Sequence, residues 1–204
     1  MKLWLTPLIL ASCVSGADSL SSTDQAVSAH ECPANTPATL APAADQDLAF
    51  ALNATGTQNY VCAAAGTGYA WTFVAPEALL YREHGHCRHD DPLVHHFAGP
   101  TWQAVDDGST IVAAKAAGAT VDTTAIPWLL LNATSHGAPT DGEDSGLMTP
   151  ITSIQRLSTE GGLAPATGCD ADHVGATADV PYTARYFFYR TQTHHPEHNV
   201  RCGG

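Results

Sequence analysis

The densest cluster of metal-binding side chains in this chain lies between residues 84 and 91. It contains His84, His86 and His89, with Cys87 among them. In an extended segment, side chains two residues apart project from the same face, so His84 and His86 would point the same way. Imidazole nitrogen is a good ligand for transition metals. The three histidines are therefore candidate ligands for zinc or copper.

The C-terminal tail carries a second group, His194, His195 and His198, which would complete a coordination shell if the fold brings it alongside. The interpretation that we favour is a solvated, histidine-rich loop that binds metal only weakly or adventitiously. Short His-rich tracts are signals of composition rather than of a site. The spacing also fits no closed zinc motif, and Cys87 would not be a ligand if it forms a disulfide.

A second set of residues suggests acid–base chemistry. His96 and His136 are candidate general bases near neutral pH, and Arg156 is a candidate anion-binding group. The alternative for His96 is a core histidine hydrogen-bonded under Trp102, and for Arg156 it is a structural charge paired with an aspartate. No nucleophile elbow, zinc-protease or phosphate-loop motif occurs in the sequence. The three residues are therefore catalytic candidates without a named reaction.

Large aromatic side chains offer a third kind of site, a face that binds a ligand. Aromatic residues in half-buried strands more often belong to the core, so only a cluster on an exposed face would favour binding. The candidates for ligand contact are Trp102, Trp128 and Tyr182, with Trp71 and Tyr186 as further members.

Short strands are the elements that must position these side chains. Residues 69–75 place large apolar side chains at every second position, which is typical of a half-buried strand. Pro76 ends this segment, and Gly56 separates the two segments before it. The other strand candidates are residues 48–52, 58–62, 78–81, 126–131, 151–157 and 182–189.

Turn signals are frequent between these strands. Asp107-Gly108 between apolar runs predicts a hairpin, Pro127 breaks the chain at the start of its strand, and residues 137–147 predict a surface loop. No convincing helical stripe is present. The pattern indicates an all-β fold, an antiparallel β-sandwich or barrel with long loops.

The length of 204 residues favours one domain with a real core. The formal net charge is −12, with only eight Lys and Arg residues together. Nucleic acid is not an expected partner, because binding it needs a basic face. Electrostatic docking to anionic lipid is disfavoured for the same reason.

The N-terminus predicts export. A basic start and a short apolar run make residues 1–17 a signal peptide, and the run is too short to span a bilayer. Leu10-Ala11-Ser12-Cys13 ends this run as a bacterial lipobox would, and we favour lipidation of Cys13 over ordinary cleavage before Asp18. A lipid at Cys13 is the only membrane contact expected. The Asn53 and Asn132 sequons would matter only in a eukaryotic host.

The mature chain divides into three parts by composition. Residues 18–44 are rich in Ser, Ala, Thr and Pro and predict a flexible linker. Residues 45–190 form the β domain, and residues 191–204 are a His-rich tail. Export makes disulfides plausible, but spacing alone does not fix their pairing. The cysteines beyond Cys13 are Cys32, Cys62, Cys87, Cys169 and Cys202.

Several segments together resemble one family, and they extend from about residue 40 to about residue 190. They are residues 56–62, 96–102, 126–130, 152–157, 161–162, 164–165, 168–169 and 180–184, with Tyr186 and Tyr189. The chain resembles the family named domain of unknown function 3455 (DUF3455), which is found in secreted proteins of bacteria and fungi. The family has no established activity. The resemblance implies a disulfide between Cys62 and Cys169. It does not cover the histidines of residues 84–91, Cys32, Cys87, Cys202 or the tail.

The sequence favours an exported, non-enzymatic binding protein of the cell envelope or the extracellular space. Its partner would be a small molecule or an envelope component that the sequence does not identify. The alternatives are a His-dependent or metal-dependent enzyme and a purely structural surface protein.

A metal measurement tests the candidate zinc or copper site. If His84, His86 and His89 are ligands, the untagged chain should hold near-stoichiometric metal, and changing all three to Ala should remove it and lower the melting temperature. Elemental analysis and thermal unfolding, each with and without chelator, measure both effects. Substoichiometric metal with an unchanged melting temperature would contradict the site.

Overall fold

The computed structural model describes residues 32–33, 35–82, 91–192 and 202. Almost all regular structure in them is β-strand. The strands are β1 (Gln46–Ala65), β2 (Gly68–Tyr81), β3 (Val94–Phe97), β4 (Thr101–Ala104), β5 (Thr110–Ala119), β6 (Trp128–Gly137), β7 (Ile151–Gly161) and β8 (Thr177–Thr191). Two short 3₁₀ helices, η2 (Ala38–Leu40) and η3 (Ala171–His173), complete the elements. The predicted all-β class is confirmed.

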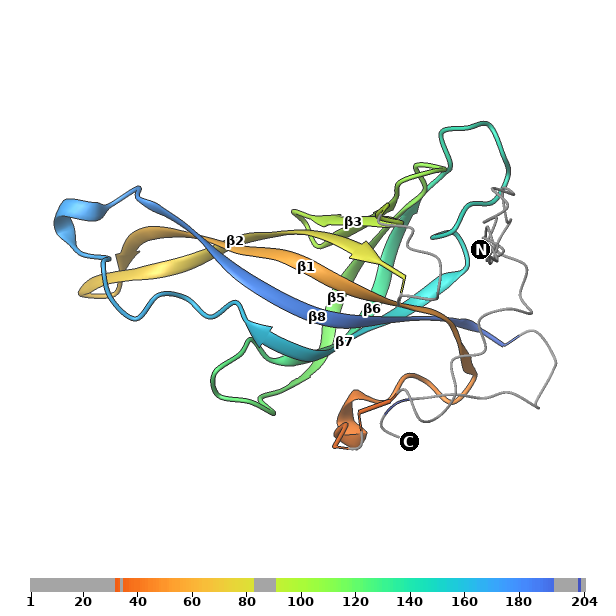
Figure 1. The fold of residues 1–204 in the computed structure, drawn as a ribbon, viewed down its shortest axis with the longest axis horizontal. Helices are drawn as coiled ribbons and strands as arrows, with labels where there is room; N and C mark the ends of the chain where they lie inside the picture. Colours follow the sequence, from red (N-terminus) through yellow and green to blue (C-terminus); the bar gives the residue numbers. More distant parts are fainter. Residues whose placement is uncertain (1–31, 34, 83–90, 193–201, 203–204) are drawn as a thin grey trace, which may run out of the picture.

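The strands form a closed antiparallel barrel (Figure 1). Each strand pairs with the next in the chain, and β8 returns to pair with β1. The closing ladder is long, from Gln46 opposite Thr191 to Val61 opposite Thr177. Of the two predicted all-β architectures, the structure therefore adopts the barrel.

β1 runs straight through Gly56, which the sequence suggested as a break. The reason for a glycine here is steric. A Cβ at Gly56 would lie 2.1 Å from the Glu77 carbonyl oxygen and 2.5 Å from the Ala78 Cα. Glycine therefore lets the β1 and β2 backbones approach closely, and the two predicted segments are one strand.

β2 likewise continues through Pro76, which was expected to end it. The β1–β2 pairing shifts register between Asn59 and Tyr60, so β2 carries an irregularity beside the proline. Bulges of this kind are where a sheet tolerates proline. The predicted half-burial was also wrong, because Tyr69 is 44% and Phe73 is 49% exposed.

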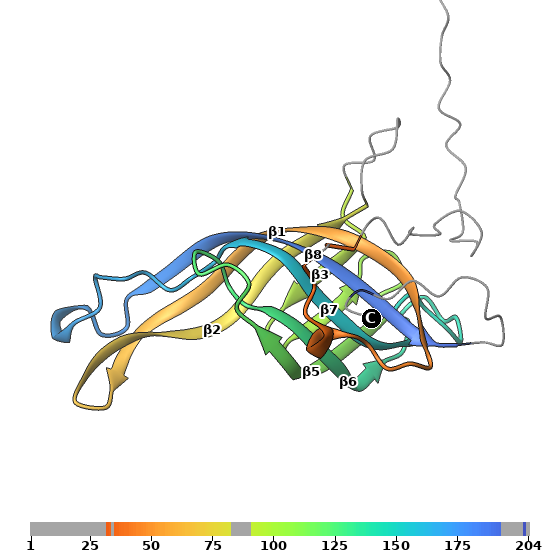
Figure 2. The ribbon, with the colours of Figure 1, turned by 90° about the horizontal axis from the view of Figure 1, so that it is seen from below.

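These side chains are exposed because β1 and β2 extend beyond the barrel as an arm, defined here as residues 59–75. Figure 1 shows the arm at the left, with the start of β8 and the β7–β8 loop (residues 162–176) beside it. Figure 2 shows that the arm is curved.

Three turn predictions are confirmed. β4 and β5 are joined through Asp107 and Gly108, whose φ of 72° suits glycine. β6 begins directly after Pro127. Residues 138–150, which connect β6 to β7, are mostly exposed, but their Met148 side chain is fully buried.

A second, smaller core lies on the outer face of the barrel. Outward side chains of β6, β7 and β8, including Trp128, pack there against Leu40 and Cys202. The outward Gln155 side chain donates to both Leu40 O (2.5 Å) and Cys202 O (2.9 Å). A Cys32–Cys202 disulfide joins the two ends. The described end of the segment expected to be a linker thus packs on the barrel.

The close approach at Gly56 leads to a stability prediction. Gly56→Ala should destabilise the fold by at least about 2 kcal/mol, because backbone atoms that the new Cβ would meet cannot rotate away. Gly68→Ala is the matched control and should stay within about 0.5 kcal/mol of the parent, since nothing lies within 4 Å of a Cβ there. Urea unfolding measures both. Equal effects would show that strand approach is not the constraint.

Candidate functional site

The barrel interior is apolar at one end and polar at the other. The apolar end is where the β4–β5 turn and the β6–β7 loop lie, and its core includes Phe50, Ile151 and Met148. The opposite end, the arm end, is where the arm leaves the barrel. Its inward-facing side chains include Gln58, His96 and Arg156.

The apolar end is closed by the β6–β7 loop. Asp107 accepts hydrogen bonds from the Ser109 and Leu147 backbone N–H groups, both at 2.7 Å. The Ser109 hydroxyl accepts from the Met148 N–H at 3.0 Å. Burial alone would raise the pKa of Asp107, but these hydrogen bonds lower it on balance. The loop is thus fixed with Met148 inside the barrel.

A row of cross-strand partners crosses the arm end. Tyr182 lies opposite Gly56, Gly56 opposite Ala78, Ala78 opposite His96, and His96 opposite Trp102. Directly opposed residues of antiparallel strands share a face, so all of these face the interior. Two of them carry little or no side chain, which leaves interior space for the rings on either side.

Tyr186 is the centre of the arm-end group. Its ring lies 5.5 Å from the His96 ring and 6.0 Å from the Trp102 ring, both edge-on. Its hydroxyl lies 3.2 Å from the Tyr182 hydroxyl. Arg156 is its cross-strand partner on β7. We call this group the interior cluster: Gln58, His96, Trp102, Arg156, Tyr182 and Tyr186.

His96 is buried and stacked flat on Trp102, with ring centroids 4.1 Å apart. Its Nδ1 lies 2.9 Å from the Thr101 carbonyl oxygen, which can only accept, so Nδ1 carries the proton. Burial, with smaller contributions from the charges of Arg156 and His95, lowers the pKa of His96 to about 3, although the hydrogen bond to Thr101 opposes this shift. The imidazole is therefore neutral at physiological pH, and its Nε2 has a lone pair.

Arg156 is a half-buried charge without an acidic partner. Its Nη2 donates to the Pro127 carbonyl at 2.9 Å, and its Nε is buried without a hydrogen bond. Within the described part of the chain, no carboxylate forms an ion pair with it. The arginine–aspartate pair considered from the sequence is therefore not found there.

The tyrosines around Arg156 remain protonated. Burial raises the pKa of Tyr182 and of Tyr186, and the nearby guanidinium only partly opposes this effect. Tyr60, at the base of the arm, is affected in the same way and donates to the Gly162 carbonyl at 2.6 Å. The surroundings of Arg156 are thus neutral.

Three side-chain N–H groups of the interior cluster have no acceptor in good hydrogen-bond geometry, although the Tyr182 hydroxyl interacts with the Gln58 amide and the Tyr186 hydroxyl with the Arg156 guanidinium. The three groups are Gln58 Nε2, Trp102 Nε1 and Arg156 Nε. Gln58 is 3% and Trp102 is 1% exposed, so solvent at the surface does not satisfy them. Buried donors are almost always paired, and each exception calls for an explanation.

The structure brings together four of the residues singled out from the sequence: His96, Trp102, Arg156 and Tyr182. It does not bring His136 to them. His136 is exposed, and its Nε2 donates to the Ile151 carbonyl at 2.7 Å. Gln58 was not among the candidates. Gln58 faces inward in β1. This position would have made it a candidate if β1 had been predicted to continue through Gly56.

Trp128 lies outside the barrel and borders a separate surface cleft of about 530 Å³. Ser158, in the cleft wall, has a left-handed backbone with φ of 48°, where β7 shifts register against β8. The cleft is lined by Asn35, Val121, Asp122, Thr123, Trp128, Ser158, Thr159 and Glu160.

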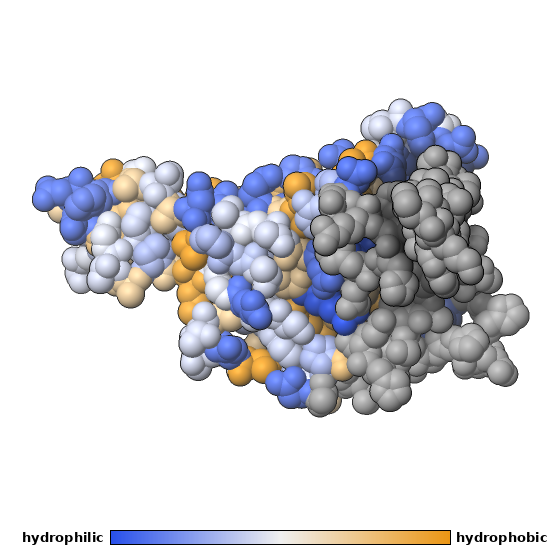
Figure 3. All heavy atoms as spheres, in the orientation of Figure 1, coloured by the Kyte–Doolittle hydropathy of each residue, from blue (hydrophilic) through white to orange (hydrophobic). Residues whose placement is uncertain are grey.

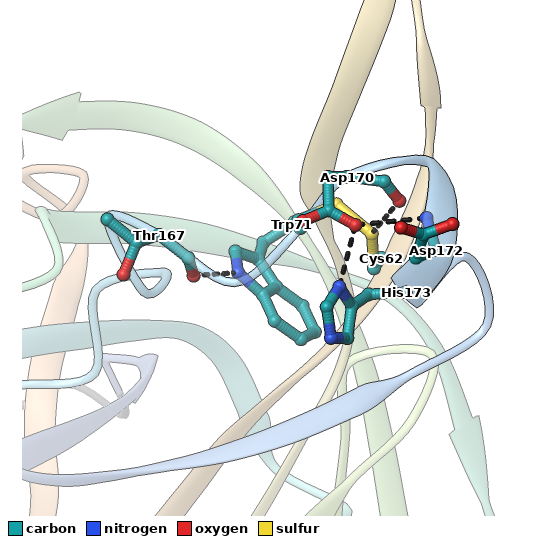
Figure 4. A network of polar contacts seen from close by, with 7 residues as sticks. Cys62, Trp71, Thr167, Asp170, Asp172 and His173 are labelled. Carbon is teal, nitrogen blue, oxygen red and sulfur yellow. Dashed lines mark hydrogen bonds and ion pairs between the residues drawn. A yellow bond between two sulfur atoms is a disulfide. The ribbon is translucent and has the colours of Figure 1, made fainter.

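The inner face of the arm continues the interior face of the barrel. Tyr60, which is inward-facing, pairs with Phe73, and Cys62 pairs with Trp71. The β7–β8 loop crosses this face: Trp71 Nε1 donates to Thr167 O at 2.9 Å (Figure 4). Exposed aromatic rings therefore lead from the arm toward the interior cluster.

The Cys62–Cys169 disulfide fixes the β7–β8 loop to the arm. Beside it, the Asp170 carboxylate caps η3 by accepting from Asp172 N, and it also contacts His173 Nδ1 at 2.6 Å (Figure 4). The Cys62–Cys169 pairing is the one that the family resemblance implied. Two disulfides indicate an oxidising, extracellular type of environment.

Comparison with protein families gives one match, to the model described as "Protein of unknown function (DUF3455)", over residues 42–190. The chain belongs to the DUF3455 family. The match covers every strand of this DUF3455 barrel except the last residue of β8. Comparisons with curated proteins and with solved structures gave no match.

Several of the sequence predictions for this DUF3455 chain concern residues outside the ranges that the structure describes. The signal peptide, Cys13 and the histidines at 84, 86, 89, 194, 195 and 198 lie outside the described residues. Among the described residues, no three His, Cys, Asp or Glu side chains are grouped to hold a metal. No helix in that part of the chain is long and apolar enough to cross a membrane.

The buried imidazole predicts a pH dependence of stability. In the unfolded chain His96 binds a proton below about pH 6.5, whereas the folded form stays neutral down to about 3, so acid favours unfolding in this window. Between about pH 7 and pH 5, His96 should therefore remove about 2 kcal/mol of stability. Urea unfolding at pH 7 and at pH 5 measures the loss of stability between them. This loss should be smaller by about 2 kcal/mol in His96→Asn than in the parent protein. Equal losses in the two proteins would contradict a neutral buried imidazole.

Proposed function

We propose that this domain is an exported, non-enzymatic binding protein that holds a small molecule at the arm end of its barrel. The observation that carries the proposal is the set of three buried N–H donors without acceptors in the interior cluster. A ligand with acceptor atoms would satisfy them. Antiparallel eight-strand barrels are of a size to be filled by side chains or to hold one small ligand.

The protonation states of the interior cluster support binding rather than proton transfer. His96 is a weak base, because burial lowers its pKa to about 3. Tyr182 and Tyr186 are poor acids, because burial raises their pKa. A general acid or base works best with a pKa near the operating pH. The cluster is therefore better suited to recognise a ligand than to move its protons.

The surroundings of the cluster support a ligand with an apolar part. His96, Trp102 and Tyr186 provide ring faces and edges inside the barrel. Phe73 and Tyr69 are exposed on the arm face that leads to them. Figure 3 shows hydrophobic residues at the surface where the arm meets the barrel. Aromatic surfaces next to buried donors are typical of small-molecule sites.

Export is part of the same proposal. The disulfides suit a protein that works outside the cytoplasm, and the basic, apolar N-terminus suits a signal peptide. Lipidation of Cys13 would keep the barrel at the cell envelope. Mass spectrometry of the protein purified from its source distinguishes a lipidated Cys13 from a chain that begins at Asp18.

Small-molecule titration tests the binding site. Benzamide and benzoate carry acceptor oxygens, whereas toluene has a similar ring and none. At least one of the first two should raise the melting temperature and quench tryptophan fluorescence saturably, and toluene should not. Trp102→Phe, which removes one donor and keeps a ring, should weaken binding by about tenfold. Trp128→Phe is the matched control, since Trp128 lies outside the barrel. Wild-type responses to benzamide and benzoate no larger than those to toluene would overturn a site for ring-bearing ligands, and failure of formate, formamide, acetate and acetamide as well would overturn the proposed function.

A further inference from the structure

We infer that the interior cluster selects an oxyanion, a small carboxylate or a group of similar shape, whose oxygens accept from Arg156, Trp102 and Gln58. This inference rests on the proposed function and names the chemistry of its ligand. It stands on two separate observations, the uncompensated charge of Arg156 and the donor character of its neighbours.

The charge of Arg156 calls for a negative partner. A guanidinium does not lose its proton in a protein, so the charge persists at every working pH. Charges withdrawn from water are normally paired, and Arg156 is half-buried with its Nε fully enclosed. The chain has 20 Asp and Glu residues, yet none of them is among the buried residues of the described part. The missing negative charge would therefore come from a ligand.

The unpaired atoms point to the same ligand. All three are N–H donors, on Gln58, Trp102 and Arg156. A single water molecule would accept from two of them at most, and it would leave the charge of Arg156 uncompensated. A carboxylate has two oxygens with about four acceptor positions and a full negative charge. It matches both the number of donors and the charge.

The cluster also disfavours a cationic ligand. His96 is neutral, so its unprotonated Nε2 is one acceptor near Arg156. The phenol oxygens of Tyr182 and Tyr186 contact each other. The remaining full charge is positive. A cation would meet Arg156 at close range without a carboxylate to offset the repulsion.

Arg156 gives the cluster a connection to solvent. Its side chain is half-buried, whereas the other cluster members are buried. It donates to Pro127, at the start of β6, so the guanidinium lies where the β5–β6 connection meets the barrel. An anion approaching this end would meet the positive charge first, in a protein whose net charge is otherwise −12.

Matched carboxylates and amides of the same shape test the inference. The probes are formate with formamide, acetate with acetamide and benzoate with benzamide, titrated into the mature wild-type chain at constant ionic strength and about pH 7.5, where the acids are ionised. For the best-fitting size, we expect the carboxylate to bind at least about tenfold more tightly than its amide. Fluorescence titration and the melting temperature report the affinities.

Arg156→Gln should remove this preference. It keeps a polar side chain of similar length but no charge, so carboxylate and amide should then bind within about threefold of each other. Arg185→Gln is the matched control, because Arg185 lies over the Phe187 ring on the outer face of the adjacent strand. It should leave the preference unchanged. The wild-type comparison needs no variant, so the test stands even if Arg156→Gln does not fold.

The outcomes separate the inference from the proposed function. Equal wild-type affinities for a carboxylate and its amide would overturn the oxyanion inference and leave a binding site for neutral molecules. A preference that survives in folded Arg156→Gln would also overturn it, whatever the result for Arg185→Gln. Binding of none of the six probes would overturn both the inference and the proposed function.

Discussion

The pairing of β1 with β8 is the interaction on which the rest of the molecule depends. It closes the sheet along a ladder that extends over nearly all of both strands. Closure encloses most inward side chains of the barrel, because an eight-strand barrel is either filled by its own side chains or holds one small ligand. It also places Tyr182 opposite Gly56 and Tyr186 opposite Leu52. The interior cluster therefore exists only in the closed barrel, although its members are spread over most of the chain.

Closure makes the position of Arg156 energetically demanding. Its neighbours on β7, Gln155 and Leu157, face outward, where Gln155 finds two carbonyl acceptors. Arg156 faces inward, where it finds the Pro127 carbonyl and the Tyr186 hydroxyl but leaves its Nε unpaired. A partly satisfied polar group in a low-dielectric interior is more costly than a fully paired one. Partly unpaired polar groups of this kind are most often found at functional sites. The position of Arg156 therefore supports a ligand site in the barrel.

The sequence predicted the strands better than it predicted their junctions. Alternation and turn residues identified β7, β8, the start of β6 and the Asp107-Gly108 turn, because these are local properties. Gly56 and Pro76 were wrongly predicted to end strands. Their local tendency to break a strand is overridden by a close backbone approach at Gly56 and an irregular register beside Pro76. Both effects come from β1 and β2 lying together, which no single segment reveals.

The site was predictable as a set of residues but not as an arrangement. His96, Trp102, Arg156 and Tyr182 carry unusual chemistry for strand positions, and that alone made them candidates. Trp128 and Leu129 show what was missing: they are adjacent, yet the first packs outside the barrel and the second against the interior core. A segment that is apolar at every position does not indicate its inner face. Which of the two alternating faces of a strand lies inside the barrel is set by the register of neighbouring strands.

The barrel separates the parts that stabilise it from the parts that could bind. The apolar end, with its fixed loop and Met148, and the outer core around Leu40 bury most of the large side chains. The arm end holds the unpaired donors and carries the arm, which has little apolar cover of its own. A two-stranded ribbon is marginally stable in water. Pairing with β8 and the Cys62–Cys169 disulfide hold it in place. The aromatic face of the arm is thereby a fixed extension of the barrel interior, and its rings can meet a ligand without first being ordered.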